Sequence, residues 1–270
     1  MLRTRVISVI ISLPIMIAAL YLGGKTLAFL TCLLSIVGLH EYYNAFKNAD
    51  FKPNALIGFF GAICYYAIIT INKNSIVLLS SMLFIILILL FFDIIKRDRS
   101  ILDIAITILG LIYIPFLFSN IQFLQKGNYG RALVLLPFVT AWLSDTLAYF
   151  AGINFGKHKL CPKISPNKTI EGALGGIAGS TLFCFIAGAV FYKTGISIPL
   201  FHYLIVGILC GITGQIGDLF ASSIKRFCKI KDFGRILPGH GGILDRFDSI
   251  LFTAPTVYIY FKLFFKILSK

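Results

Sequence analysis

Long apolar runs separated by short polar segments make up most of this chain. The run Val77–Phe92, VLLSSMLFIILILLFF, carries no charged residue. A helix needs about 17–25 mainly apolar residues to cross the hydrocarbon core of a bilayer, which is about 30 Å thick. Runs of this kind are expected at residues 6–22, 27–46, 55–71, 76–95, 101–121, 131–152, 170–192, 198–222 and 248–268.

All of these runs are predicted to be helices. In lipid, backbone N–H and C=O groups must be paired within their own segment unless strands close into a barrel. The runs lack the strict alternation of barrel strands. The first run has the basic start and apolar core of a signal peptide, but no small-residue cleavage site follows it. The predicted fold is therefore all-α, a polytopic membrane protein with about nine transmembrane helices.

The basic residues predict the orientation of these helices. Seventeen of the 25 Lys and Arg residues lie at the N-terminus or after the second, fourth, sixth and eighth runs. The positive-inside rule places this side, with the N-terminus, in the cytoplasm. All 11 acidic residues lie on or toward the same side. The net charge of +14 then reflects topology and attraction to anionic lipid headgroups, so membrane lipids and no nucleic acid are the expected partners.

One membrane domain covering residues 1–270 is expected. Residues 1–130 would form N-terminal spans, and residues 131–270 would form catalytic spans with long basic cytosolic loops at 153–169 and 223–247. The six cysteines include no C-x-x-C pair, so they are interpreted as small hydrophobic residues rather than a disulfide framework.

Acidic residues in or beside the spans are the first candidates for chemistry, because charge inside a membrane is costly. Asp145 and Asp218 lie near the cytosolic ends of their spans, and Asp248 opens the last one. Asp245 and Asp248 are three residues apart and would share one helical face. Close carboxylates repel unless a cation joins them, and such oxygen ligands suit Mg²⁺ carrying a phosphate substrate. The alternative is that these acids pair with Lys and Arg and anchor helix ends.

A glycine-rich segment, PGHGG at residues 238–242, precedes the last span. Gly241 and Gly242 permit a close backbone approach, and successive N–H groups at a helix N-terminus can bind an anion. A basic run, residues 225–235, lies just upstream. This combination predicts a nucleotide or polyphosphate site. His240 either contacts the phosphate or metal there or hydrogen-bonds a loop carbonyl.

Two further places remain open to more than one interpretation. Thr169 can cap the helix that follows it, and the neighbouring Lys168 is either a second phosphate contact or a solvated lysine. His40 and Glu41 lie near the cytosolic end of the second span. They are either interfacial anchors or residues that line a site.

Residues 222–248 form a long polar run, SSIKRFCKIKDFGRILPGHGGILDRFD. This run resembles the signature of the phosphatidate cytidylyltransferases, the CDP-diacylglycerol synthases. The matching positions are Ser222, Lys225–Arg226, Lys231–Asp232, Pro238, His240–Gly242, Asp245–Arg246 and Asp248. The segments SDTLAYFAGINFGKHK and SPNKTIEG upstream are also similar to family segments. One position departs from the pattern, because family members usually carry a glutamate where this chain has Ala221.

The resemblance implies transfer of CMP from CTP to phosphatidate, which gives CDP-diacylglycerol and pyrophosphate. Expected metal ligands are Asp218, Asp245 and Asp248. Residues expected to act on the phosphates, or beside those that do, are Lys225, Arg226, Lys231, Asp232 and Arg246. Expected substrate-binding residues are Lys168, Ser222, His240, Gly241, Gly242 and Asp145. Mg²⁺ is the expected cofactor, with a monovalent cation as a further candidate, and the family implies a homodimer.

A bacterial plasma membrane with the active site facing the cytoplasm is the expected location. Three other functions compete with this interpretation: a transporter, a membrane enzyme acting on a prenyl or alcohol substrate, and an inactive relative affected by Ala221. A transporter site tends toward the midplane between structural repeats. The acidic residues of this chain cluster toward one side instead.

Overall fold

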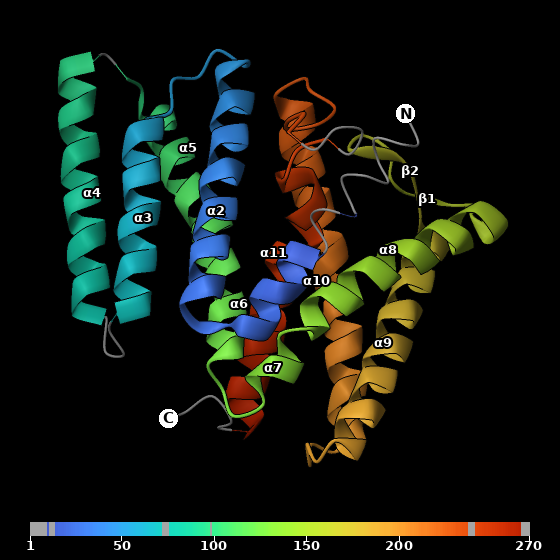
Figure 1. Cartoon of the computed structure of the whole chain (residues 1–270). Coiled ribbons are helices and arrows are strands. Elements are labelled where there is room, and N and C mark those ends of the chain that lie inside the picture. Colours follow the sequence, from blue (N-terminus) through green and yellow to red (C-terminus); the bar gives the residue numbers. More distant parts are fainter. Residues whose placement is uncertain (1–9, 11–13, 72–75, 98, 237–240, 266–270) are drawn as a thin grey trace. The chain divides into compact units, whose positions relative to one another are not determined.

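The computed structural model of the chain describes residues 10, 14–71, 76–97, 99–236 and 241–265 (Figure 1). Within this part the helices are joined by turns and loops, and the other regular secondary structure is one short β-hairpin, so the prediction of a helical fold is confirmed. Residues 14–22 are also helical. The elements are α2 (Gly24–Lys47), α3 (Ala55–Ile71), α4 (Ile76–Arg97), α5 (Ile101–Leu111), η1 (Ile112–Phe116), α6 (Leu117–Gln125), α7 (Gly130–Leu133), α8 (Leu136–Phe155), β1 (Lys159–Cys161), β2 (Ser165–Thr169), α9 (Ile170–Lys193), α10 (Leu200–Phe227) and α11 (Leu244–Phe265).

Several helices are long and apolar enough to cross a membrane, as the sequence predicts. Six such segments occur in the described part of the chain: Gly24–Lys47, Ile76–Ile95, Ile101–Gln125, Gly130–Phe155, Ile170–Lys193 and Leu200–Phe227. Helix α3 is apolar but has 17 residues. Of the first predicted span, residues 6–22, the structure describes residue 10 and residues 14–22, which are helical. Helix α11 begins at Leu244, four residues before the predicted span, and carries Asp245, Arg246 and Asp248 in its opening turns.

The segment Ile101–Gln125 is helical throughout but changes its winding at its centre. Residues Ile112–Phe116 form a π-helical turn that contains Pro115. Proline has no N–H to donate and its ring clashes with the preceding turn, so a locally wider turn accommodates it. At the start of the segment, Ser100 and Asp103 form a capping box.

The chain divides into two compact units. Unit 1 comprises Met1–Gln122 and Phe227–Arg246, and unit 2 comprises Phe123–Arg226 and Phe247–Lys270. Residues 228–236 and 241–243, together called the signature loop below, belong to unit 1 even though they follow α10 in the chain. Residues 237–240, between these two stretches, lie outside the described residues and are not part of what is called the signature loop.

Unit 1 is built around α2, and α3 lies between α2 and α4 (Figure 1). The ring of Tyr43 occupies the space beside Gly58 and Gly110, where any Cβ would lie less than 3.0 Å from it. The Tyr43 hydroxyl donates to the Thr107 carbonyl at 2.9 Å. Glycine at both positions therefore lets a large aromatic residue join three helices.

Unit 2 is built around α8 and α9, which lie side by side (Figure 1). A Cβ on Gly175 would lie less than 3.0 Å from the Cβ of Ala151, and one on Gly176 would contact Ser144 and Ala148. Small residues permit this close approach, which is how helices commonly pack in membranes. Between α8 and α9 the chain forms the antiparallel β1–β2 hairpin, which the sequence analysis did not anticipate.

Candidate functional site

The predicted site residues fall in both units. In unit 1 the signature loop and the start of α11 carry Lys231, Asp232, Gly241, Gly242, Asp245 and Arg246. In unit 2 the predicted residues are Asp145 on α8, Lys168 on β2, Asp218, Ser222, Lys225 and Arg226 on α10, and Asp248 on α11. His240 lies outside the described residues, so the two interpretations of this histidine stay open.

Asp245 holds the signature loop against the start of α11. Its Oδ2 accepts hydrogen bonds from the N–H of Phe233, at 2.8 Å, and from the N–H of Gly242, at 3.0 Å. Gly241 has a φ of 88°, a left-handed conformation that favours glycine. A Cβ there would lie 3.2 Å from Asp245 Oδ2. One oxygen of this predicted metal ligand is thus used to fold the loop.

Glu41 on α2 binds the other end of the same loop. The N–H of Ile243 donates to Glu41 Oε1 at 2.9 Å, and the N–H of Leu244 donates to Oε2 at 2.8 Å. Glu41 is only 2% exposed. The carboxylate therefore takes two of the N–H groups that a helix N-terminus leaves without intrahelical partners.

These contacts change the interpretation of the glycine-rich segment. The sequence predicts that its backbone N–H groups bind a phosphate. In the structure the N–H groups of Gly242, Ile243 and Leu244 donate instead to Asp245 and Glu41. A phosphate at these three groups would have to displace a carboxylate of the chain. The backbone pattern of an anion site is present, and the protein's own acids occupy it.

Asp218 is the centre of the predicted residues in unit 2. Lys168 forms an ion pair with Asp218 Oδ2, and the Ser222 hydroxyl donates to Asp218 Oδ1 at 3.2 Å. The side chains of Lys168 and Asp218 are both 28% exposed. The hairpin thus brings its lysine to α10, and the sequence-predicted trio of Lys168, Asp218 and Ser222 lies together.

Asp248 lies near the same group within unit 2. It is 9% exposed, and it interacts electrostatically with Asp218, Asp145 and Lys225. Its Oδ1 accepts from the N–H of Ser249 at 2.7 Å. Two acids and a lysine, on α8 and α10, are therefore close enough for their charges to affect Asp248 on α11.

These residues fit the chemistry that Mg²⁺ requires. Mg²⁺ is usually held by one or two carboxylates together with substrate phosphates and water. Asp218 and Asp248 supply two such carboxylates, which repel each other in the absence of a cation. Among the residues that the structure describes, no three His, Cys, Asp or Glu side chains group to hold a metal without further ligands. Asp218 and Asp248 would therefore hold a metal only together with further ligands such as substrate phosphates or water.

The hairpin is held at its base and at its turn. Glu171, in the first turn of α9, accepts from the N–H groups of Lys157, at 3.0 Å, and His158, at 3.2 Å. His158 Nδ1 lies 2.6 Å from Glu171 Oε1. Arg226 Nε donates to the Ile164 carbonyl at 3.2 Å. Arg226, predicted to contact phosphate, thus also fastens the hairpin that carries Lys168.

Sequence reasoning had only part of the signal for the two glutamates. An acid in an apolar span marked Glu41 as a candidate, but nothing local indicated its partners in the signature loop. For Glu171, an acid in the first turn of α9, the local sequence indicates only a favourable charge at a helix N-terminus and not its partners Lys157 and His158. Ala221, where the family usually has glutamate, is fully buried on α10.

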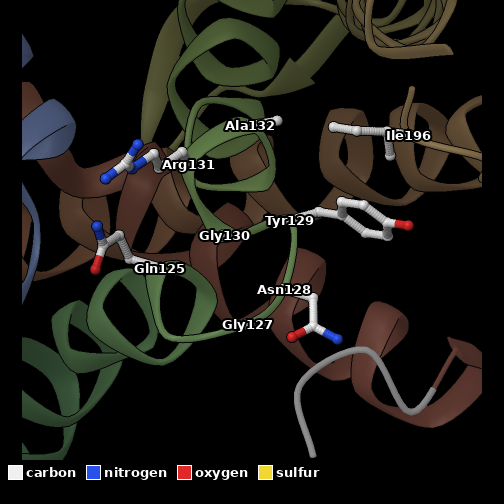
Figure 2. A pocket seen from close by; sticks show the side chains of 8 residues that line it. All are labelled: Gln125, Gly127, Asn128, Tyr129, Gly130, Arg131, Ala132 and Ile196. Carbon is white, nitrogen blue, oxygen red and sulfur yellow. The ribbon is translucent and has the colours of Figure 1, made fainter. Parts of the chain in front are cut away.

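A cavity of about 490 Å³ lies elsewhere in unit 2 (Figure 2). In Figure 2, Gln125 and Arg131 lie on one side of it and Tyr129 and Ile196 on the other. None of the predicted site residues lines it. Its lining residues are Gln125, Gly127, Asn128, Tyr129, Gly130, Arg131, Ala132 and Ile196.

The fold and these residues define a class: a helical membrane enzyme in which acids on α8, α10 and α11 lie near lysines of β2 and α10. The chain belongs to the cytidylyltransferase family, whose model matches residues 3–264. It is 36% identical over 262 residues to the phosphatidate cytidylyltransferase of Staphylococcus haemolyticus, covering 95% of this chain and 98% of that relative. The enzyme of the same name from Staphylococcus aureus strain COL is 35% identical over 265 residues, with the same coverage. The family resemblance of the signature is confirmed.

Proposed function

We propose that this enzyme transfers CMP from CTP to phosphatidate, giving CDP-diacylglycerol and pyrophosphate. The observation that carries the proposal is the pair Asp218 and Asp248 in unit 2, with Lys168 bound to Asp218 and Lys225 beside Asp248. Paired acids among lysines suit a metal-bound polyphosphate. The names of the relatives supply the substrates.

In the proposed reaction a phosphate oxygen of phosphatidate attacks the α-phosphorus of CTP. The bond from that phosphorus to the oxygen bridging the α- and β-phosphates breaks, and pyrophosphate leaves with the bond electrons. The lipid phosphate is already an anion at neutral pH, so no strong general base is required. The main barrier is the approach of two anions, which positioning and charge neutralisation lower.

Asp218 and Asp248 are the residues proposed to hold Mg²⁺, and Asp245 remains a further predicted ligand. Bound Mg²⁺ supplies positive charge to the triphosphate and to the leaving pyrophosphate. Lys168 and Lys225 neutralise phosphate oxygens in unit 2. Ser222 and Asp145 contact the substrate or the proposed metal ligands Asp218 and Asp248. A monovalent cation remains a further candidate cofactor.

The signature loop is proposed to bring Lys231 and Arg246 to the phosphates. Asp232 keeps its predicted role in this loop, and His240, which lies outside the described residues, stays a predicted substrate contact. Gly241 and Gly242 are proposed to shape the loop beside the substrate, because the N–H of Gly242 already donates to Asp245. The active site is proposed to face the cytoplasm, where CTP is available, and the membrane is proposed to be a bacterial plasma membrane. A homodimer is the proposed assembly.

The test uses the full-length protein in lipid nanodiscs with α-³²P-labelled CTP, phosphatidate and Mg²⁺. We expect lipid-soluble label only when phosphatidate is present. Asp248→Asn and Asp218→Asn should each lower its formation about a hundredfold or more, because each removes a metal-binding charge. The matched control is Asp50→Asn: Asp50 is exposed and has a φ of 65°, which asparagine tolerates.

Label that enters lipid without phosphatidate would contradict the proposed acceptor. Retention of normal turnover by both Asp218→Asn and Asp248→Asn at limiting Mg²⁺ would contradict the proposed metal site. Equal losses in Asp50→Asn would show that the assay reports general damage rather than the site.

A further inference from the structure

Glu41 is a buried acid for which the proposed reaction has no direct use. It lies on α2, within a helix long and apolar enough to span the membrane, and is 2% exposed. An acid in such a place is costly unless its charge is paired or hydrogen-bonded. Its carboxylate accepts hydrogen bonds from the backbone N–H groups of Ile243 and Leu244, more than 200 residues later in the chain. The role of Glu41 is therefore to be sought in the signature loop.

Two glycines of the signature loop lie directly against this carboxylate. A Cβ on Gly234 or on Gly242 would lie less than 3.0 Å from Glu41 Oε1. A flexible glutamate could normally swing aside to admit such a methyl group. Glu41 cannot do so without releasing the N–H groups of Ile243 and Leu244, which would be left unpaired at a partly buried and a buried position respectively. Gly234 and Gly242 are thus required by the position of Glu41.

Gly241 is a glycine for a different reason. Its φ of 88° strains any other residue, and the three atoms nearest to a Cβ there belong to Asp245 and Asp232 rather than to Glu41. The loop therefore contains two glycines that make room for Glu41 and one that provides a backbone turn. This difference supplies an internal control.

The geometry points to Glu41 as a positioning residue that holds the signature loop, with Lys231 and Asp232, and the start of α11, with Asp245 and Arg246, in the arrangement that binds the nucleotide. This inference rests on the proposed function, because it assigns the loop to CTP. Glutamate suits the role for two reasons. Its two oxygens accept the two N–H groups, and its negative charge is favourable at the N-terminus of α11.

The first test is a set of double-mutant cycles read by limited trypsin digestion of the full-length protein in nanodiscs. Mass spectrometry follows cleavage after Lys229, Lys231 and Arg235, which lie in the signature loop. Gly242→Ala and Gly234→Ala should each speed this cleavage about tenfold in the native background and by less than about twofold in the Glu41→Ala background. Gly241→Ala should speed it by the same factor in both backgrounds, because its cost is conformational.

If all three glycine substitutions speed cleavage by the same factor in the Glu41→Ala background as in the native background, Glu41 does not determine the loop position and the inference fails. The same is true if Glu41→Ala leaves loop cleavage unchanged. Neither reading depends on catalysis. An inactive native protein would overturn the proposed function, whereas the digestion would still decide whether Glu41 holds the loop.

The second test separates positioning from general structural support. Glu41→Gln keeps the size of the side chain and one acceptor oxygen but places an amide NH₂ toward a backbone N–H. We expect the KM for CTP to rise about tenfold while the KM for phosphatidate stays within about twofold. Glu41→Asp, which keeps the charge, should bind CTP better than Glu41→Ala.

A fall in kcat with both KM values unchanged, matched by a smaller folded fraction, would show that Glu41 supports the fold without positioning the nucleotide. That result would overturn the inference. Unchanged kcat and KM values in Glu41→Gln would overturn it as well.

Discussion

Glu41 in unit 1 and Glu171 in unit 2 perform the same local task in different surroundings. Each accepts backbone N–H groups from a polar loop and fastens that loop to a helix. Glu41 is 2% exposed, whereas the side chain of Glu171 is 24% exposed. An N–H group that loses its partner near water can bind water, but a buried one cannot. The contribution of such a carboxylate to stability therefore depends on its burial rather than on the number of hydrogen bonds that it accepts.

The two loops also use their residues differently. The signature loop is held by carboxylates that bind its backbone, and its glycines make those contacts possible. The β1–β2 hairpin is held through Glu171 and Arg226, which leaves Lys168 to pair with Asp218. In unit 1 the contacts fix the backbone of the signature loop, whereas in unit 2 they fix the position of the Lys168 side chain.

The largest expected contrast is between one cysteine in each loop. Cys161 on β1 is partly exposed, whereas Cys228 is 2% exposed and its burial raises the pKa of the thiol to about 11. At pH 8 about a thousandth of such a thiol is ionised, against about a quarter of an ordinary one. A water-soluble maleimide should label Cys161 more than about a hundred times faster than Cys228. Mass spectrometry of the native protein measures the labelling rate at each cysteine, and the variants Cys161→Ser and Cys228→Ser assign the labelled sites. Equal labelling rates at Cys161 and Cys228 would contradict the expected contrast between the loops.

The next largest contrast compares alanine at the two glutamates. Glu41→Ala leaves one buried and one partly buried N–H group unpaired, which should cost about 2–4 kcal/mol and lower CDP-diacylglycerol formation about a hundredfold. Glu171→Ala should lower it by about threefold or less, because water can replace the lost acceptor. Chemical unfolding in detergent and the labelled-CTP assay measure the two effects. Similar losses in the two variants would show that burial does not govern these contacts.

Lys168 tests whether the hairpin acts through its side chain. Lys168→Gln removes the ion pair with Asp218 and should lower kcat/KM about tenfold, with partial recovery in Lys168→Arg. Lys163→Gln is the matched control, since Lys163 is an exposed lysine on the same hairpin. The steady-state assay decides, and equal effects at Lys163 and Lys168 would indicate a general effect of loop charge.

The smallest expected effect concerns the junction of the hairpin with α9. Thr169 is the N-cap of α9, and its hydroxyl accepts from the N–H of Gly172 at 3.1 Å. Thr169→Ala should lower the free energy of unfolding by about 1 kcal/mol, whereas Thr169→Ser should keep most of it. Unfolding of the purified protein measures the difference. Equal stability of the alanine and serine variants would show that the cap contributes nothing.

The sequence predicted the helical class of the fold because the signal is carried by continuous apolar runs. It also predicted the cap at Thr169, and the spacing of the signature identified its candidate residues. It did not predict the β-hairpin, because the segment 153–169 is short and its strands pair through register rather than through an apolar pattern. The helix start at Leu244 was predicted only in part: the apolar span was expected from residue 248, although Asp245 and Asp248 were expected to share one helical face.

The candidate site was predictable as a set of residue types but not as a set of contacts. Lys168 and Asp218 are 50 positions apart in the chain and meet only because the hairpin folds back to α10. The segment at Gly241–Gly242 has the composition of an anion site. Composition cannot tell whether the anion is a substrate phosphate or a carboxylate of the same chain.

By itself the sequence determined that this is a helical membrane protein and which acids, lysines and glycines are available for its chemistry. These properties are local, because the length of an apolar run and the spacing of a motif need no partner. The tertiary structure decided which groups these residues bind. Glu41 meets the N–H of Leu244 across 203 positions, and a hydrogen bond forms only where folding brings donor and acceptor within about 3 Å of each other.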